Sequence, residues 1–183
     1  MLNQTDRLKP RLPGRRNNTE EMIRVDQAGE YGAVQIYRGQ MAVLSNRASG
    51  ATIAHMARQE EEHLVKFDAL MNARQVRPTA LSPFWHMAGF ALGAGTALMG
   101  EKAAMACTVA IEEVIEEHYN EQAEELGVRD PELSALIEEC CADEVAHKET
   151  ALEHGAQETP GYGLMSALIK AGAKTAIRIA RKI

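Results

Sequence analysis

Two halves of this chain carry the same arrangement of glutamate and histidine. Each half has a lone glutamate and, thirty or thirty-two residues later, a second glutamate three positions before a histidine. These residues are Glu30, Glu60 and His63 in the first half and Glu112, Glu144 and His147 in the second. A glutamate and a histidine three residues apart lie on one face of an α-helix. Four antiparallel helices would therefore direct four carboxylates and two imidazoles to one point.

The repetition makes a metal site the best interpretation of these residues. A single copy of the motif would be weak evidence for a metal site, because glutamate is common on helix surfaces and a lone histidine is more often structural. Carboxylate and imidazole ligands suit iron or manganese better than metals that prefer thiolate, and this set is typical of ferritin-like di-iron and di-manganese bundles. We therefore expect an all-α fold: a ferritin-like antiparallel four-helix bundle with an apolar crossover helix and a C-terminal amphipathic helix.

Helical periodicity selects the ligands among neighbouring acids only in part. Glu61 and Glu62 come directly after Glu60 and face away from His63, so we expect them in solvent. In the second half, four acids compete to be the lone glutamate ligand, and periodicity alone does not decide among them. They are Glu112, Glu113, Glu116 and Glu117.

Two tyrosines favour Glu112 in that choice. Tyr37 comes seven residues after Glu30, and Tyr119 comes seven residues after Glu112, so each pair shares a helix face. If symmetry relates the two halves, Glu112 corresponds to Glu30. Core packing explains the tyrosines as well as a redox or proton-transfer role does. His118 lies about 120° around the helix from Glu112, so we expect it to affect reductant or proton delivery rather than metal binding.

Two aspartates and two glycines near the repeated motif each have two possible interpretations. Asp26 and Asp143 are candidates to orient a ligand imidazole through its second nitrogen, and solvent exposure is the alternative for both. Gly29 and Gly32 flank Glu30 in an expected helix, where each glycine costs about 1 kcal/mol relative to alanine. The close approach of another helix or of a substrate would account for that cost, and a merely tolerated glycine is the alternative.

Capping residues divide the chain into helices. Asp130 followed by Pro131 is a strong helix opening, and Gly127 is a good helix stop. The expected helices cover residues 19–44, 51–74, 101–126 and 131–154, with an apolar Gly-rich segment at 84–99 and a last helix after Gly161. We expect one ferritin-like di-iron domain over 19–183, preceded by a flexible basic tail over 1–18.

The three cysteines do not indicate a disulfide framework. They are Cys107, Cys140 and Cys141, and no C-x-x-C spacing occurs among them. A reducing compartment is therefore expected. Cys140 and Cys141 are most simply small core residues of a helix.

Charge is distributed unevenly along the chain. The net charge is -6, yet basic residues gather in residues 1–16 and in the last helix. Because the positive charge is not on the main body, we expect no nucleic-acid binding. Basic ends can instead meet an anionic membrane lipid surface.

The last helix is the strongest membrane signal. Its basic residues recur every four positions and are Lys170, Lys174, Arg178 and Lys182. The opposing apolar face contains Met165, Leu168, Ile169, Gly172, Ala176, Ile179, Ala180 and Ile183. A basic amphipathic helix is typical of membrane-surface binding, although packing on the bundle is the alternative. Segment 84–99 is too short to span a bilayer and suits either its interface or a buried crossover. We expect monotopic attachment.

Four stretches of sequence carry a resemblance to a known family. They are MIRVDQAGEYGA at Met22–Ala33, EEEH at Glu60–His63, EEVIEEHY at Glu112–Tyr119 and DEVAH at Asp143–His147. Together they resemble the Coq7 family, the demethoxyubiquinone hydroxylases of ubiquinone biosynthesis. The resemblance covers nearly the whole chain from about Glu20, and the stretch RVDQAGE is highly specific.

The resemblance implies an oxidoreductase with two iron ions per subunit. Such a monooxygenase inserts one oxygen atom from O2 into the ring of a polyprenyl demethoxyubiquinone, as a 3-demethoxyubiquinol or demethoxyubiquinone 5-hydroxylase. The resemblance also implies Glu112 rather than Glu113 as a ligand. Tyr119 and His118 are our candidate catalytic residues. We expect a peripheral protein on the cytoplasmic face of the bacterial inner membrane, with the matrix side of the mitochondrial inner membrane as the alternative.

The electron source and the partners are less constrained. No Gly-rich dinucleotide fingerprint occurs in the sequence, so electrons would come from a reductase, from NADH or from the quinol substrate. A homo-oligomer or a ubiquinone-biosynthesis complex is the expected assembly. The alternatives are a quinol oxidase of the alternative-oxidase type, an iron-storage or detoxification bundle, and a lipid-binding scaffold with a vestigial site.

Overall fold

Helices make up the regular structure of the described chain. The computed structural model describes residues 18–182, and no strand occurs among them. Its helices are α1 (Asn18–Leu44), α2 (Gly50–Ala73), α3 (Ser82–Leu98), α4 (Glu101–Leu126), α5 (Pro131–Glu153), the 3-10 helix η2 (Ala156–Glu158) and α6 (Tyr162–Ala180). The expected all-α fold is confirmed. The flexible basic tail expected over residues 1–18 lies outside the described residues except for Asn18, which begins α1 instead.

Local chemistry explains where the helices begin and end. The side chain of Asp130 accepts a hydrogen bond from the Leu133 backbone N–H at 3.1 Å, which caps the start of α5. Arg74, directly after α2, donates to the same carboxylate at 2.9 Å. Gly127 follows α4 with a φ of 50°, a conformation that favours glycine. These residues fix the turn between α4 and α5 and join it to the end of α2.

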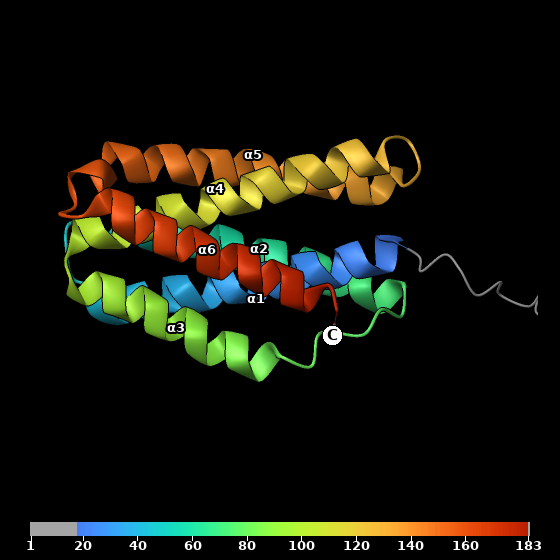
Figure 1. Ribbon diagram of the computed structural model, residues 1–183, viewed down its shortest axis with the longest axis horizontal. Coiled ribbons are helices and arrows are strands. Elements are labelled where there is room, and N and C mark those ends of the chain that lie inside the picture. The colour runs from blue at the N-terminus through green and yellow to red at the C-terminus, as the bar shows by residue number, and fades with distance from the viewer. Residues whose placement is uncertain (1–17, 183) are drawn as a thin grey trace, which may run out of the picture.

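Four long helices form the bundle, and two shorter ones cover one side of it. α1 packs against α2, and α4 packs against α5. α3 packs on α1, while α6 lies along α4 and also touches α1 (Figure 1). The apolar crossover helix and the C-terminal helix expected from the sequence therefore lie on the same side of the bundle. No helix among residues 18–182 has both the length and the hydropathy needed to cross a bilayer.

The two largest of the four apolar clusters among the described residues lie inside the bundle. One includes Ile23, Phe67, Leu133 and Tyr119. The other includes Leu44, Ile53, Met105 and Tyr37. The repeated glutamate and histidine residues lie between these clusters along the helices, so apolar side chains close the bundle on both sides of them.

Glycine allows α3 to approach α1 very closely. A Cβ on Gly93 would lie 1.9 Å from the carbonyl oxygen of Ile36, and a Cβ on Gly39 would lie 2.3 Å from that of Phe90. Large apolar side chains of α3 instead point outward, with Phe84 59% and Met87 72% exposed. Gly89 and Gly93 therefore pack on the backbone of α1, while Phe84 and Met87 point away from the bundle. The segment is therefore not a fully buried crossover, and its placement in a bilayer interface stays a prediction.

The basic residues of α6 are partly used by the bundle itself. Lys170 forms an ion pair with Glu113, and Lys174 forms one with Glu117 at 2.6 Å. Both acids are on α4. Two of the four basic residues expected to face a membrane, Lys170 and Lys174, therefore help to hold α6 on α4. This agrees with the alternative interpretation, in which the last helix packs on the bundle. The apolar face is also divided, because Ile169 is buried and Leu168 is 65% exposed; its last residue, Ile183, lies outside the described residues.

The close packing of α3 on α1 gives a matched pair of substitutions. Gly93→Ala should lower the free energy of unfolding by about 1–3 kcal/mol, the usual cost of overpacking, because the obstacle is backbone. Gly95→Ala, two residues later in α3, meets no heavy atom within 4 Å. It should raise the free energy by up to about 1 kcal/mol through helix propensity. Urea denaturation measures both, and equal effects of the two changes would contradict this packing.

Candidate metal centre

The six residues of the repeated motif meet inside the bundle. Glu30 comes from α1, Glu60 and His63 from α2, Glu112 from α4, and Glu144 and His147 from α5. Each of these side chains belongs to a residue that is at most 2% exposed. The bundle therefore buries four carboxyl groups and two imidazoles together, which is costly unless other charges compensate.

These side chains form two overlapping groups of ligand atoms. One group is Glu30, Glu60, His63 and Glu144, and the other is Glu60, Glu112, Glu144 and His147. Within each group the candidate ligand atoms lie within 4.8 Å of one another. Glu60 and Glu144 belong to both groups. The arrangement offers two adjacent positions that share two carboxylates, each completed by one further glutamate and one histidine.

Both imidazoles turn the same nitrogen inward. Nδ1 of His63 lies 3.3 Å from Glu144 and 3.5 Å from Glu30, and Nδ1 of His147 lies 3.0 Å from Glu60. On the outer side, His63 Nε2 lies 3.0 Å from Asp143, which confirms the first of the two interpretations offered for Asp143. His147 Nε2 lies 3.2 Å from the side-chain oxygen of Gln59. These outer contacts fix the orientation of each ring.

Gln59 was missed in the sequence, although the repeat contains its signal. Asp143 comes directly before Glu144, and Gln59 comes directly before Glu60. In each half, the residue before the motif glutamate holds the histidine of the other half. Comparing the two halves position by position would have identified Gln59.

The two tyrosines also cross between the halves. Tyr37 on α1 donates a hydrogen bond to Glu112 Oε1 on α4 at 2.7 Å, and Tyr119 on α4 donates one to Glu30 on α1. The sequence placed each tyrosine on the face of its own glutamate, and the hydrogen bond instead goes to the glutamate of the opposite helix. Each hydroxyl holds one carboxylate oxygen, while Glu30 Oε2 and Glu112 Oε2 have no hydrogen-bond partner within residues 18–182.

The sequence-based role for Asp26 is wrong. Its Oδ1 lies 3.0 Å from His118 Nε2 and accepts a hydrogen bond from Gln122 at 2.7 Å, so it orients neither His63 nor His147. Asp26 is 2% exposed and His118 is 7% exposed. Burial raises the pKa of Asp26, although the contact with His118 opposes that shift. Helical position alone could not tell which imidazole of another helix would reach this carboxylate.

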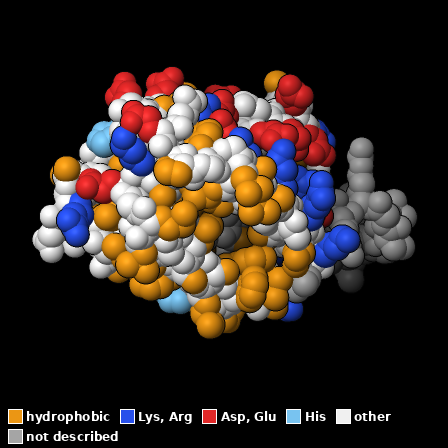
Figure 2. Space-filling view, turned by 60° about the vertical axis from the view of Figure 1, so that its left-hand side comes forward, with side chains coloured by type: hydrophobic (Ala, Val, Ile, Leu, Met, Phe, Trp, Pro, Cys, Tyr) orange, Lys and Arg blue, Asp and Glu red, His pale blue; other side chains and the backbone are white. Residues whose placement is uncertain are grey.

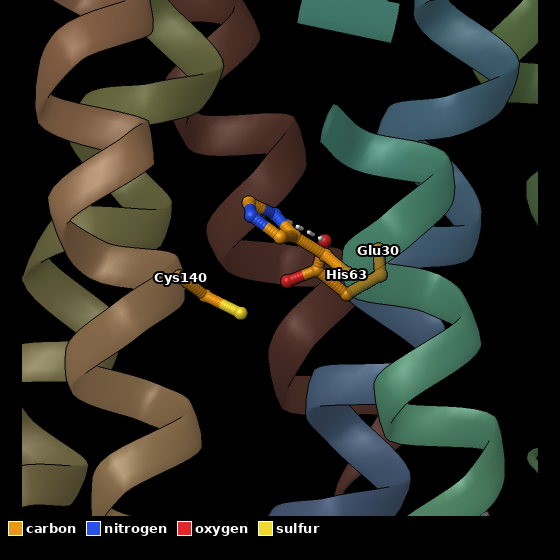
Figure 3. A group of neighbouring side chains, drawn as sticks. All are labelled: Glu30, His63 and Cys140. Atoms are coloured by element: carbon orange, nitrogen blue, oxygen red, sulfur yellow. Dashed lines mark ion pairs between the residues drawn. The ribbon is translucent and has the colours of Figure 1, made fainter. Parts of the chain in front are cut away.

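Cys140 is a buried core residue, as expected, and it also borders the centre. Its sulfur lies within 4.8 Å of ligand atoms of Glu30 and His63. Figure 3 shows the thiol pointing from α5 toward these two side chains. Cys140 is one helical turn before Glu144 and shares its face, which is the signal that the sequence offered. Burial, together with Glu30 and Glu144, raises the pKa of this thiol.

The polar atoms at the centre fit divalent cations. Among the described residues no hydrogen bond satisfies Nδ1 of either imidazole, either oxygen of Glu60 and Glu144, or the inner oxygens of Glu30 and Glu112. Buried polar atoms are almost always satisfied, by ions where nothing else serves. Burial, and next the charge of Glu144, raise the pKa of Glu60 and Glu112 well above the usual range of glutamate. Oxygen and imidazole donors suit iron or manganese.

An apolar cavity lies on the side of the bundle covered by α3 and α6, next to sequence neighbours of Glu30 and Glu112. Its volume is about 810 Å³, and residues of α1, α3, α4 and α6 line it. The lining includes Gly29 and Gly32, which flank Glu30, and Ile111, which precedes Glu112. A Cβ at either glycine would meet no heavy atom within 4 Å. Figure 2 shows a hollow within the apolar face of the molecule. Gly29 and Gly32 therefore leave space beside the centre and do not serve helix packing.

Comparison with known proteins gives a consistent result. The family model described as "Ubiquinone biosynthesis protein COQ7" matches residues 17–180. A Rhodospirillum rubrum protein named 3-demethoxyubiquinol 3-hydroxylase is 49% identical over 177 residues, which cover 94% of this chain and 84% of that protein. A Bos taurus protein named NADPH-dependent 3-demethoxyubiquinone 3-hydroxylase, mitochondrial, is 48% identical and covers 92% and 79%. A Saccharomyces cerevisiae protein named 5-demethoxyubiquinone hydroxylase, mitochondrial, is 39% identical and covers 90% and 78%.

The electrostatics of the centre predict how the metal-free protein responds to pH. Burial alone would lower the pKa of His63, but Glu144 and Glu30 raise it from 6.5 to about 12. The pKa of Glu60 and that of Glu112 are raised above 4.5. A group whose pKa is higher in the folded than in the unfolded protein contributes its full stability below the pKa of the unfolded state. This stability is lost as the pH rises through the pKa of the folded state.

In chelator, the free energy of unfolding should therefore fall as pH rises from about 6 to about 9, by about 1.4 kcal/mol per pH unit for each extra proton that the folded state holds. Urea titrations across this range measure the slope. Glu60→Gln should flatten it, because an amide does not titrate. A stability that rises with pH in the metal-free protein would contradict the assignment.

Proposed function

The chain belongs to the COQ7 family of ubiquinone biosynthesis proteins, and we propose on this premise that it hydroxylates the ring of a polyprenyl demethoxyubiquinone with O2. The relatives are demethoxyubiquinone hydroxylases by name, but their names number the ring differently, with 3 in one and 5 in another. The proposal therefore replaces the 5-hydroxylation expected from the sequence by hydroxylation of the ring carbon that lacks a methoxy group.

The observation that carries this proposal is a buried centre of carboxylates and imidazoles beside an apolar cavity. We assign two iron ions to it, held by Glu30, Glu60, His63, Glu112, Glu144 and His147, with Glu60 and Glu144 shared. When bound, the two ions supply O2 activation and two electrons. The protein itself fixes the ligands through Asp143, Gln59 and the two tyrosine hydroxyls, and its apolar clusters keep bulk water out.

The cavity suits an isoprenoid quinone. Its walls are almost wholly apolar, and the absence of side chains at Gly29 and Gly32 leaves room for a flat ring beside α1, next to Glu30. Trp85 also lines the cavity, and its indole N–H has no hydrogen-bond partner among the described residues. We propose that the ring lies against α1 and that the tail leaves between α3 and α6. The apolar walls position the ring carbon and exclude water from it.

The electron donor is proposed to be a reduced nicotinamide or a reductase that uses one. The name of the bovine relative includes NADPH dependence. His118 and Tyr119 are the candidates to assist reduction of the centre. Asp26 contacts His118, the next residue is Tyr119, and the Tyr119 hydroxyl donates a hydrogen bond to Glu30. The hydroxyl of Tyr119 can hold or release a proton at the Glu30 carboxylate.

Replacing His118 and Tyr119 separately tests these roles. Tyr119→Phe removes the donor to Glu30 and should change the absorption spectrum of the iron-loaded centre. His118→Ala should keep the iron content and that spectrum, and should slow reduction by the donor. Iron analysis and stopped-flow reduction measure both. Equal loss of iron in the two variants would contradict this division of roles.

Attachment to a lipid surface follows from the substrate and from the exposed side chains. The helices that flank the cavity carry large exposed apolar residues: Phe84, Met87, Leu98, Leu164 and Leu168. A long isoprenoid tail resides in a bilayer, so the cavity should open there. We propose peripheral attachment through the outer faces of α3 and α6. The bovine and yeast relatives are named mitochondrial, and the Rhodospirillum rubrum relative is not.

Apolar substitutions test this attachment more cleanly than charge reversal, because Lys174 already pairs with Glu117. Met87→Ser with Leu168→Ser should weaken binding to anionic liposomes by roughly tenfold or more, since two large side chains leave the lipid. Val128→Ser is the control, because Val128 is 94% exposed but lies between α4 and α5. Liposome co-sedimentation measures the difference. Equal binding by the double variant and the control would rule out this surface.

Product analysis tests the function. The metal-free protein is loaded with Fe²⁺ without oxygen, mixed with demethoxyubiquinone and reductant, and exposed to ¹⁸O₂. Mass spectrometry should show one labelled hydroxyl oxygen on the ring. Gly32→Leu is the control for the cavity: it should retain iron and fold, because nothing lies within 4 Å of the added Cβ, but lose turnover. Consumption of O2 with water as the only product would instead indicate a quinol oxidase, and a large particle with an iron core would indicate storage.

A further inference from the structure

One residue of the centre has no part in the proposed hydroxylation. Cys140 is fully buried, and its sulfur forms a third candidate ligand group with Glu30 and His63. Glu30 Oε2 and His63 Nδ1 are buried and lack hydrogen-bond partners among the described residues. In Figure 3 the thiol points from α5 toward these two side chains, which come from α1 and α2. Three donors from three helices thus surround one position with oxygen, nitrogen and sulfur.

Among the described residues, a thiol borders the centre on one side only. In the repeat, the position four residues before the motif glutamate holds Cys140 in the second half and Met56 in the first. The Met56 thioether lies 3.9 Å from the Tyr37 hydroxyl and belongs to none of the ligand groups. A thioether cannot become a thiolate. The group of Glu60, Glu112, Glu144 and His147 therefore has oxygen and nitrogen donors alone.

Donor chemistry separates the two positions by metal preference. Thiolate with imidazole and carboxylate is a ligand set that Zn²⁺ accepts in tetrahedral geometry, with a fourth place left open. Iron or manganese suits the position without sulfur better. We propose that Glu30, His63 and Cys140 form a mononuclear site for a thiophilic divalent cation such as Zn²⁺, overlapping the first of the two iron positions. Binding converts the thiol to a metal thiolate and releases one proton.

This site gives the chain a choice of metal that the hydroxylase function does not require. Zn²⁺ has no redox chemistry, so an ion bound to Cys140 excludes iron from Glu30 and His63 and keeps the centre inactive. The ratio of available zinc to iron would then set the active fraction of the protein. The metal binding does not depend on the proposed reaction, whereas its effect on the active fraction rests on the proposed function.

Cobalt spectroscopy tests the proposal directly. Co²⁺ commonly replaces Zn²⁺, and a thiolate ligand gives it an intense near-ultraviolet charge-transfer band. Adding Co²⁺ to the metal-free protein should produce this band, and Zn²⁺ should abolish it by displacement. Cys140→Ser should lose the band and bind Zn²⁺ at least about tenfold more weakly, since even outer-shell partners contribute about 10- to 100-fold.

Cys141→Ser is the matched control. Cys141 is the next residue, is half-buried and belongs to none of the ligand groups, so its replacement should keep the band. Circular dichroism checks that each variant is folded, and Cys140→Ala provides a second removal of the sulfur. A wild-type protein that binds Co²⁺ without the band would overturn the proposal, as would a band that survives Cys140→Ser. Either result could coexist with two bound irons and normal turnover, so it would leave the proposed function standing.

Discussion

The burial of four carboxyl groups in one place is the constraint on which the rest of this structure depends. Isolated charges of one sign are costly inside a protein, and the two imidazoles cannot neutralise all four glutamates. The centre can keep its carboxylates charged only with added cations, and without them it must take up protons. The packing around the centre keeps water from these charges, because an apolar cluster closes the bundle on each side of it. Each cluster also supplies one tyrosine, which donates a hydrogen bond to Glu30 or Glu112.

The sequence predicts the bundle well because its signals are local. Asp130 and Gly127 mark helix ends by their own chemistry, and the repeated spacing of glutamate and histidine requires only helical geometry. Asp143 was a candidate because it precedes Glu144, although its contact with His63 also crosses between helices. The contacts that were missed or misassigned all cross between helices: the exchange of tyrosines, the contact of Asp26 with His118, and the approach of Cys140 to Glu30. Periodicity gives the face of a side chain, while its partner depends on the axial offset between helices.

Glycine serves two opposite purposes on α1, and sequence alone could not separate them. Gly39, with Gly93 on α3, allows the backbones of the two helices to come into contact. Gly29 and Gly32 are on the same helix, yet they leave open space beside Glu30. The first use fixes the helix that covers the cavity, and the second creates the wall of that cavity. Each glycine lowers the stability of its helix by roughly 1 kcal/mol relative to alanine. The cavity wall and the contact with α3 therefore both reduce the intrinsic stability of α1.

Iron counting in variants of the shared and unshared glutamates tests the central claim most directly. Glu60 and Glu144 belong to both ligand groups, whereas Glu112 belongs to one. After anaerobic loading with Fe²⁺, Glu112→Gln should keep one strongly bound iron, at the position of Glu30 and His63. Glu144→Gln should lose strong binding at both positions, because it removes a carboxylate that both ions need. If Glu144→Gln and Glu112→Gln retain the same number of irons, the two groups do not share their carboxylates and the account of this centre is wrong.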